Sequence, residues 1–317
     1  MSAGPAAVGR QPEAVRFPGA RSRIVTVAAV QLPGCGIDPD ANARVAADAL
    51  EEAASMGAEI AVLPELALWP YFCVHDPEPY RKWAVPVPGQ VTERFAALAR
   101  RLEMAVVLPL YEHDPSTGRF HNAAVVIGAD GELEPSVDRH GVKRLATRKL
   151  HLPAGTEPAP AFDEPAHFTA GDGLGVYEVA GLRFGVLICY DRRFPECWRE
   201  LRALGAEAAL VPVAASGGDS TEFFVCELRT HARENGLIAA APNKCSEEWL
   251  GDERIENFGE SVIVDADGEV AARRSASEGA GTVMLALDLE HLGERRAHLR
   301  YFDDRRTDLL PSADPVG

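Results

Sequence analysis

Short apolar runs alternate with helical patterns along most of the chain. Apolar runs without polar alternation are typical of strands buried on both faces, and apolar residues three and four apart are typical of amphipathic helices. The pattern predicts strands over 23–33, 58–65, 104–112, 206–215, 237–244 and 281–289, and helices over 41–57, 91–103, 195–205 and 221–236. Hairpins are predicted over 121–134, 175–189 and 259–272.

This alternation of helices and buried strands, with hairpins between them, indicates an α/β protein. We expect two mixed sheets packed face to face with helices outside, which is a four-layer α-β-β-α sandwich. No linker rich enough to divide the chain is visible, so we expect one domain over 23–303. Residues 1–22 are expected to form a flexible N-terminal tail, and residues 304–317 a C-terminal tail.

Composition and charge exclude several classes of function. The 317 residues carry a formal net charge of −16, which argues against nucleic acid and anionic membranes as partners, because both would repel the protein. Residues 1–22 lack the apolar stretch of a signal peptide, and the apolar runs are too short to cross a bilayer. The six cysteines form no C-x-x-C pair, so we expect no metal and a cytoplasmic location.

The stretch FGVLICYDRRFPECWRELRALGAE places Cys189 between a buried strand and a helix. Pro195 suits a first helical turn, so Cys189 falls on a tight turn near a helix N-terminus, where an anion is favoured. A reactive thiolate fits this position. An inert, buried cysteine fits it as well, because free cysteines are often packing residues.

Two further positions carry candidate chemistry. Glu65 ends the strand AEIAVLPE, where carboxylates line ligand crevices, although a solvated loop carboxylate would look the same. Lys149 lies in the apolar run RKLHLPAG, where its charge needs a partner or a function unless the strand is at a sheet edge. A glutamate can take a thiol proton, and a lysine and the backbone N–H of Tyr190 can stabilise the oxyanion that follows thiolate attack.

The segments AVLPELAL, RKLHLP and GVLICYDRRFPECWRELRALGAE, in this order, resemble the three catalytic segments of the nitrilase superfamily of carbon–nitrogen hydrolases. The similarity extends over about 23–300. The resemblance implies a four-layer sandwich, no cofactor, a small-molecule substrate and a homodimer or higher homo-oligomer. It also implies that Glu65 is the general base, Lys149 the oxyanion-binding lysine and Cys189 the nucleophile.

A second glutamate of the family, which positions the lysine and the substrate, matches Glu164 in FDEPAHFTAGD. Asp163 and Glu157 are the alternatives for this role. Within the superfamily, the chain looks most similar to N-carbamoyl-amino-acid amidohydrolases. That branch implies that Arg192 and Arg193 bind a substrate carboxylate, unless they form structural ion pairs instead. His151, beside Lys149, and Tyr190 complete the expected substrate-binding residues.

Two departures from the D-carbamoylase pattern leave the substrate open. That branch usually has Asn after the nucleophile, where this chain has Tyr190, and a polar pair at the end of the next strand, where it has Ala214, Ala215 and Ser216. The chain is also similar to carbamoylputrescine amidases and ω-amidases. The expected function is therefore hydrolysis of an N-carbamoyl compound, and the alternatives are a simple amidase or a silent scaffold that keeps the fold. The segment 134–147 looks longer than usual, as a lid or a surface loop.

Overall fold

The computed structural model describes residues 24–156, 161–214 and 220–309. The predicted N-terminal tail, Glu157, Ala215 and Ser216 lie outside these ranges. The helices are α1 (Pro39–Ser55), α2 (Gln90–Leu102), α3 (Glu164–His167), α4 (Pro195–Ala203), α5 (Thr221–Asn235) and α6 (Leu289–His298). Short 3-10 helices are η1 (Phe72–Val74), η2 (Glu78–Trp83), η3 (Cys189–Arg193) and η4 (Ala276–Glu278).

Fourteen strands pair into one large mixed sheet. Along the main path they are β11 (Tyr177–Val179), β12 (Leu182–Val186), β13 (Ala208–Leu210), β14 (Ile238–Ala241), β16 (Glu253–Val264), β15 (Lys244–Leu250), β1 (Ile24–Pro33), β2 (Ile60–Val62), β3 (Ala105–Asp114), β4 (Arg119–Ile127) and β5 (Leu133–Glu134). Beside this path, β17 (Val270–Ser275) pairs with β16, β18 (Gly281–Asp288) with β1, and β8 (Ala146–Arg148) with β4.

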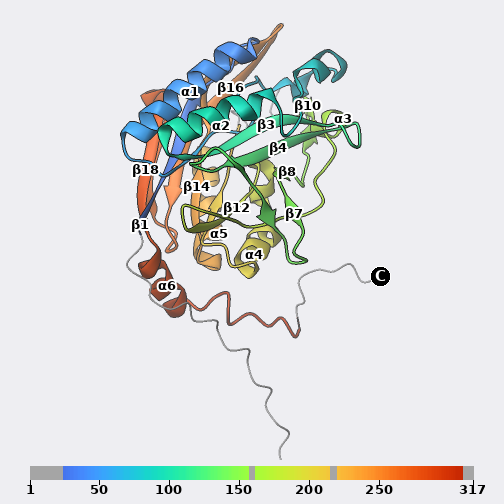
Figure 1. Cartoon of the computed structure of the whole chain (residues 1–317). Helices are drawn as coiled ribbons and strands as arrows, with labels where there is room; N and C mark the ends of the chain where they lie inside the picture. The colour runs from blue at the N-terminus through green and yellow to red at the C-terminus, as the bar shows by residue number, and fades with distance from the viewer. Residues whose placement is uncertain (1–23, 157–160, 215–219, 310–317) are drawn as a thin grey trace, which may run out of the picture.

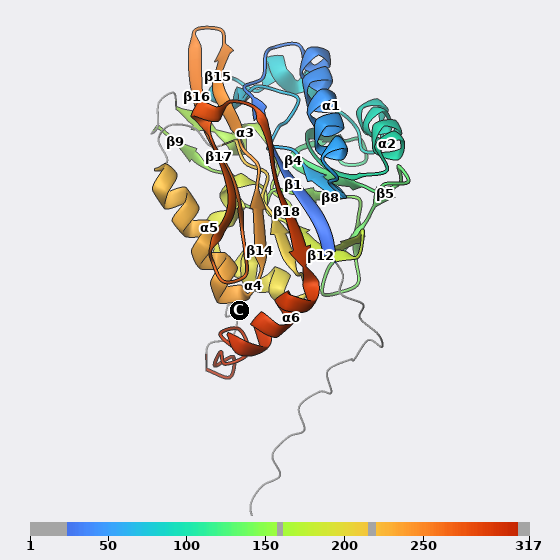
Figure 2. The same ribbon diagram turned by 90° about the vertical axis from the view of Figure 1, so that its left-hand side faces the viewer.

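Three hydrophobic clusters hold the helices and strands together. One packs α1 and α2 against β1 to β4, with Leu50 and Phe95 as buried helix residues. A second joins alternate residues of β1 and β2 to those of β12, such as Phe184. The third packs α4 and α5 on β13, β14 and β16, with Trp198 as a buried residue of α4. Figure 2 accordingly shows the strands between α5 on one side and α1 and α2 on the other.

The α/β class is confirmed, and the main strands and helices lie where the pattern predicts them (Figure 1). The pairing differs from the prediction of two separate sheets, because β1, β15 and β16 join the strands of both halves into one hydrogen-bonded path. The four-layer arrangement therefore stays a prediction. No helix in the described ranges is long and apolar enough to cross a membrane.

The segment 134–147 forms a small hairpin of β6 (Ser136–Val137) and β7 (Lys143–Arg144). The guanidinium group of Arg139 pairs with Glu200 of α4, and Arg144 pairs with Asp138 and Asp172. Val137 also forms a bridge with Val176. These contacts tie the segment to α4 and to the strand β11 region, which indicates a surface hairpin.

Candidate active site

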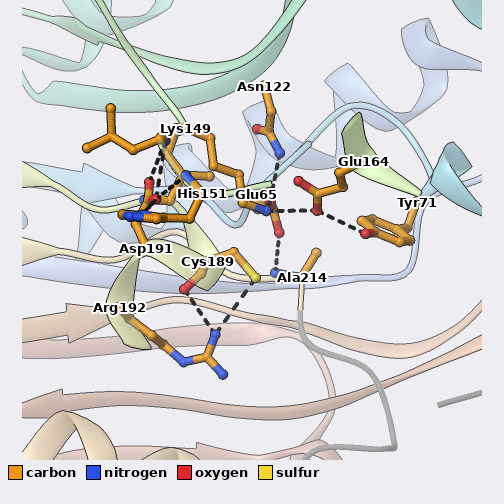
Figure 3. A network of polar contacts seen from close by, with 12 residues as sticks. Glu65, Tyr71, Asn122, Lys149, His151, Glu164, Cys189, Asp191, Arg192 and Ala214 are labelled. Atoms are coloured by element: carbon orange, nitrogen blue, oxygen red, sulfur yellow. Dashed lines mark hydrogen bonds and ion pairs between the residues drawn. The ribbon is translucent and has the colours of Figure 1, made fainter. Parts of the chain in front are cut away.

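Four segments that are distant in sequence bring the predicted catalytic residues together (Figure 3). Glu65 follows β2, Lys149 follows β8, Glu164 begins α3, and Cys189 lies after β12 at the start of η3. The side chains of Glu65, Lys149 and Glu164 are at most 1 % exposed. Charged groups are seldom buried to this extent unless they are paired, so their mutual contacts decide what the site can do.

Lys149 lies between the two carboxylates. Its Nζ is 2.8 Å from Glu65 Oε1 and 2.8 Å from Glu164 Oε1. Burial alone would lower the pKa of Lys149, but the negative charges of Glu164 and Glu65 raise it well above its usual range. The lysine is therefore a fixed positive charge, and the two carboxylates together carry more negative charge than it can balance.

Glu65 is held as a carboxylate by several donors. Asn122 Nδ2 donates to Oε1 at 2.7 Å, and the backbone N–H of Ala214 donates to Oε2 at 3.1 Å. Burial raises the pKa of Glu65, but the charge of Lys149 and hydrogen bonds from Lys149, Cys189 and Asn122 outweigh it, so the pKa is lowered. Glu65 is thus an ionised base in contact with the Cys189 thiol.

Cys189 occupies a strained position that aims its side chain at this base. Its φ is +49°, in the left-handed region that residues with a side chain rarely adopt, and its N–H donates to the carbonyl of Pro212 at 2.8 Å. The predicted tight turn after the strand is present, and it continues into η3 before α4 begins at Pro195.

The charge state of Cys189 depends mainly on its burial. Burial and the negative charge of Glu65 raise the pKa of its thiol to about 12, against the smaller lowering effects of Lys149 and Arg192. The helix N-terminus expected to favour an anion is here one short 3-10 helix, and burial outweighs it. The resting group is therefore a neutral thiol, and proton transfer to Glu65 has to accompany its reaction.

Of the two candidates for the second glutamate that the structure describes, Glu164 and Asp163, Glu164 is the one that contacts Lys149. Burial and the like charge of Glu65 raise its pKa to about 7, although Lys149 and Tyr71 act in the opposite direction. Asp163 instead caps α3, with Oδ1 accepting from the N–H of Ala166 at 3.1 Å. The Tyr71 hydroxyl donates to Glu164 Oε1 at 2.9 Å.

Asp191 connects the lysine segment to the nucleophile turn. Its carboxylate accepts the N–H of His151 at 2.8 Å, the N–H of Leu150 at 3.2 Å and the N–H of Ile188 at 3.3 Å. It also lies 2.8 Å from Nδ1 of His151, whose ring stacks on Phe194. One buried carboxylate thereby sets the distance between the segment that carries Lys149 and the turn that carries Cys189.

The two arginines after the nucleophile contact Glu227 of α5. Arg192 is 2 % exposed, with Nε 3.0 Å from Glu227 Oε2, and its Nη1 donates to the carbonyl of Cys189 at 3.0 Å. Arg193 Nη1 lies 3.5 Å from Glu227 Oε1, and its guanidinium group is 5.9 Å from the ring centre of Tyr190. The ion pairs that the sequence left open are therefore present, with Glu227 as the partner.

Sequence reasoning did not assign Asn122, Asp191 or Tyr71 to the site. Asn122 has a visible signal, because it is a polar residue inside the buried run of β4. Asp191 and Tyr71 have none, because each acts through a fold-dependent contact with a distant segment. Of the aromatic residues after Glu65, Phe72 packs against rings such as Tyr111.

The described ranges hold no group of three or more His, Cys, Asp or Glu side chains arranged to bind a metal ion. The cation at the centre of the site is the ammonium group of Lys149. A base, a thiol and a fixed positive charge in contact can attack an electrophilic carbon and stabilise the oxyanion that forms.

Comparisons with known proteins agree with this chemistry. The family model described as carbon-nitrogen hydrolase matches residues 26–297. The chain is 30% identical to an N-carbamoylputrescine amidase of Solanum lycopersicum over 314 residues, which is 93% of this chain and 99% of the relative. It is 30% identical to an omega-amidase of Xenopus tropicalis, over 84% of this chain and 90% of that protein.

A solved structure shows the same fold. The carbon-nitrogen hydrolase from Helicobacter pylori G27 superposes with a TM-score of 0.78 at 27% sequence identity. The match covers 90% of this chain and 96% of that one. The similarity extends over nearly the whole of both chains, so it covers the fold and not one segment of it.

Proposed function

The chain belongs to the carbon–nitrogen hydrolase family and is a hydrolase of non-peptide C–N bonds, and from this premise we propose that it hydrolyses an N-carbamoyl compound through a covalent Cys189 intermediate. The observation that carries the proposal is the position of Lys149 between Glu65 and Glu164, with Cys189 hydrogen-bonded to the same Glu65. In this proposal Glu65 is the base, Cys189 the nucleophile, Lys149 the oxyanion partner and Glu164 the residue that positions Lys149.

The first half-reaction transfers the carbamoyl group to sulfur. Glu65 takes the Sγ proton as Sγ bonds to the ureido carbon, and the carbonyl electrons move to oxygen, where Lys149 and the N–H of Tyr190 stabilise the negative charge. The tetrahedral intermediate collapses, the C–N bond to the amine breaks, and the amine leaves with the proton from Glu65. A thiocarbamate on Cys189 remains.

The second half-reaction restores the enzyme. Glu65 takes a proton from water, the hydroxide oxygen bonds to the thiocarbamate carbon, and the C–S bond breaks with return of the proton to sulfur. The released carbamate decomposes to ammonia and carbon dioxide. One water is consumed, and the products are amine, ammonia and carbon dioxide. The same steps would hydrolyse a simple carboxamide, with ammonia leaving in the first half-reaction.

The arginine contacts favour an amine rather than an amino acid as the leaving group. Glu227 already pairs with Arg192 and Arg193, so a substrate carboxylate would have to replace a buried carboxylate partner. An uncharged or cationic leaving group needs no such exchange and suits a protein with a net charge of −16. The similarity to an N-carbamoylputrescine amidase supports this class, and we propose that the partly exposed His151 contacts the substrate.

Ammonia release from a substrate panel tests the proposal. The panel holds N-carbamoylputrescine, N-carbamoyl-D- and L-amino acids, N-carbamoyl-β-alanine, α-ketoglutaramate and an aliphatic amide, each with a Cys189→Ala control. We expect the highest kcat/KM on the N-carbamoyl amine. Preference for α-ketoglutaramate would favour the amidase alternative, which the ω-amidase relative supports. Preference for carbamoyl acids, weakened in Arg193→Ala, would restore the carboxylate-binding role of the arginines.

The family resemblance also supports action as a homodimer in the cytoplasm, and we propose both. Size-exclusion chromatography with light scattering checks the oligomeric state.

A further inference from the structure

A second buried ion pair lies beside the active site and takes no part in the proposed mechanism. Lys244 and Glu248 of β15 are at most 1 % exposed, and Lys244 Nζ lies 2.8 Å from Glu248 Oε1. Burying both charges is costly unless each remaining donor and acceptor finds a partner. The partners of this pair are therefore informative.

These partners lie mainly in the loop that follows Glu65. Lys244 Nζ donates to the carbonyl of Trp69 at 2.7 Å, and Glu248 Oε2 accepts the N–H of Tyr71 at 2.9 Å. Glu248 Oε1 also accepts the N–H of Cys35 at 2.9 Å. The ion pair thus fixes the backbone on both sides of Pro70, immediately before the side chain that reaches Glu164.

The Tyr71 hydroxyl connects this fixed backbone to the active site. It donates to the same oxygen, Glu164 Oε1, that accepts from Lys149, whereas the other oxygen, Oε2, is buried without a hydrogen-bond partner in the described part of the chain. Removing the hydroxyl would leave Lys149 as the single donor to a buried carboxylate. Figure 3 shows Tyr71 on the far side of Glu164 from Lys149.

We propose that Tyr71 is a positioning residue, fixed by the Lys244–Glu248 pair, that holds Glu164 Oε1 against Lys149 and keeps the Glu164 carboxyl ionised during the hydrolysis proposed above. The active form has Glu164 charged, because a charged carboxylate binds the ammonium group most strongly. The inference rests on the proposed function only where the test measures turnover, since the contacts of Tyr71 do not depend on the substrate.

Other groups around Glu164 set the direction of the expected effect. Lys149 and Glu65 face it from the catalytic segments, and Cys73 faces it from η1. Asp163 and His167 lie on or next to its own helix. Burial and the carboxylates favour the neutral acid, whereas Lys149 and Tyr71 favour the anion. Loss of the Tyr71 hydroxyl therefore raises the pKa of Glu164 above its value of about 7.

Tyr71→Phe tests the proposal, with Tyr80→Phe as the matched control. Tyr80 lies nearby, stacked on Phe72, and its hydroxyl makes no described contact with Glu164. In Tyr71→Phe we expect the acid limb of kcat/KM to move up by about one pH unit, which is about a tenfold loss of activity on that limb and little loss at high pH. A profile identical to that of wild type and Tyr80→Phe would overturn the proposal.

A readout without substrate separates this inference from the proposed function. We expect the rate of Cys189 alkylation by iodoacetamide, followed by mass spectrometry across pH, to show an inflection where Glu164 titrates, because Glu164 and Cys189 both interact with Lys149. This inflection should move up in Tyr71→Phe as well. If the wild type releases no ammonia from any panel substrate but the inflection moves, the proposed function fails and the positioning role stands. An unmoved inflection overturns the role whatever the substrate.

Two further variants keep the test decisive. Incorporating 3-fluorotyrosine at position 71 makes the hydroxyl a stronger donor without removing it, so the acid limb of kcat/KM should move to lower pH. This variant provides the test if Tyr71→Phe fails to fold.

Glu248→Gln keeps an acceptor for the Tyr71 N–H but removes the charge that pairs with Lys244. We expect a smaller upward shift in that variant, and an unchanged profile would overturn the part assigned to the ion pair.

Discussion

Lys149 and Lys244 are both almost completely buried, yet their surroundings differ in charge balance. Lys244 pairs with one carboxylate, Glu248, and also contacts the backbone carbonyl of Trp69 and the Cys35 side chain. Lys149 faces two carboxylates, one of which has an oxygen without a partner in the described ranges. The Lys244–Glu248 pair is balanced in charge and holds backbone segments in place. The cluster around Lys149 carries excess negative charge and includes Glu65, a base in contact with the Cys189 thiol. Burial alone therefore does not distinguish a structural ion pair from a catalytic one.

The largest effect is expected at the nucleophile. Cys189→Ala should lower ammonia release by roughly 10³-fold or more, because no other thiol contacts Glu65 in the described part of the chain. Cys226→Ala, which removes an exposed cysteine on α5, is the control and should keep wild-type activity. Equal activity in both variants would remove Cys189 from the mechanism.

The two lysines should respond differently to the same substitution. Lys149→Met should lower kcat/KM by about 10²–10³-fold through loss of oxyanion stabilisation. Lys244→Met should mainly lower the free energy of unfolding, by about 3–5 kcal/mol, because it leaves the buried Glu248 unpaired. Steady-state kinetics and urea unfolding of both variants measure the contrast. A stable Lys244→Met variant with a 10³-fold loss of activity would contradict it.

Glu164 and Asp163 provide a matched pair of adjacent carboxylates. The pKa of about 7 for Glu164 predicts that activity rises with pH through this region, since the ionised form holds Lys149. Glu164→Gln should remove this acid limb and lower kcat/KM by about tenfold or more. Asp163→Asn should keep the acid limb of kcat/KM. It should lower the free energy of unfolding by about 1 kcal/mol at most, because it changes only the N-cap of α3. If the acid limb of kcat/KM persists in Glu164→Gln, a group other than Glu164 causes it, which would contradict this assignment.

The catalytic cluster and the Asp191 contacts differ in how far the sequence predicts them. Glu65, Lys149 and Cys189 stand out in or at the ends of apolar runs, and the resemblance to carbon–nitrogen hydrolases implies their roles. The structure brings all of them together. The sequence leaves the charge state of Cys189 open, because it shows a turn but not the burial that raises the pKa of the thiol. Asp191 and Tyr71 act through contacts that exist after distant segments pack, so no local pattern indicates them.

For the fold, too, the sequence predicts the local elements but not the contacts between distant ones. Strands such as β1 and helices such as α5 follow from their apolar periodicity. The strands join into one path through β15 and β16. The sequence predicts a strand over 237–244, where β14 lies, and a hairpin over 259–272, but neither β15 nor its pairing with β16. Long-range register of this kind is set by packing rather than by local preference.

The smallest effect is expected at the surface hairpin of β6 and β7. Arg139→Ala removes its exposed ion pair with Glu200 and should change the free energy of unfolding by less than about 1 kcal/mol. Activity should stay within twofold of wild type, about the scatter of such assays, because the hairpin does not reach the cluster around Lys149. A large change in KM would instead identify the segment as a lid.

The central claim is that Cys189 carries the carbamoyl group during turnover. Rapid acid quench of the wild type mixed with N-carbamoylputrescine, followed by peptide mass spectrometry, tests it directly. We predict that the peptide containing Cys189 gains the mass of one carbamoyl group, and that neither the added mass nor ammonia release occurs in Cys189→Ala. Turnover without this adduct, together with ammonia release by Cys189→Ala at the wild-type rate, would contradict the account.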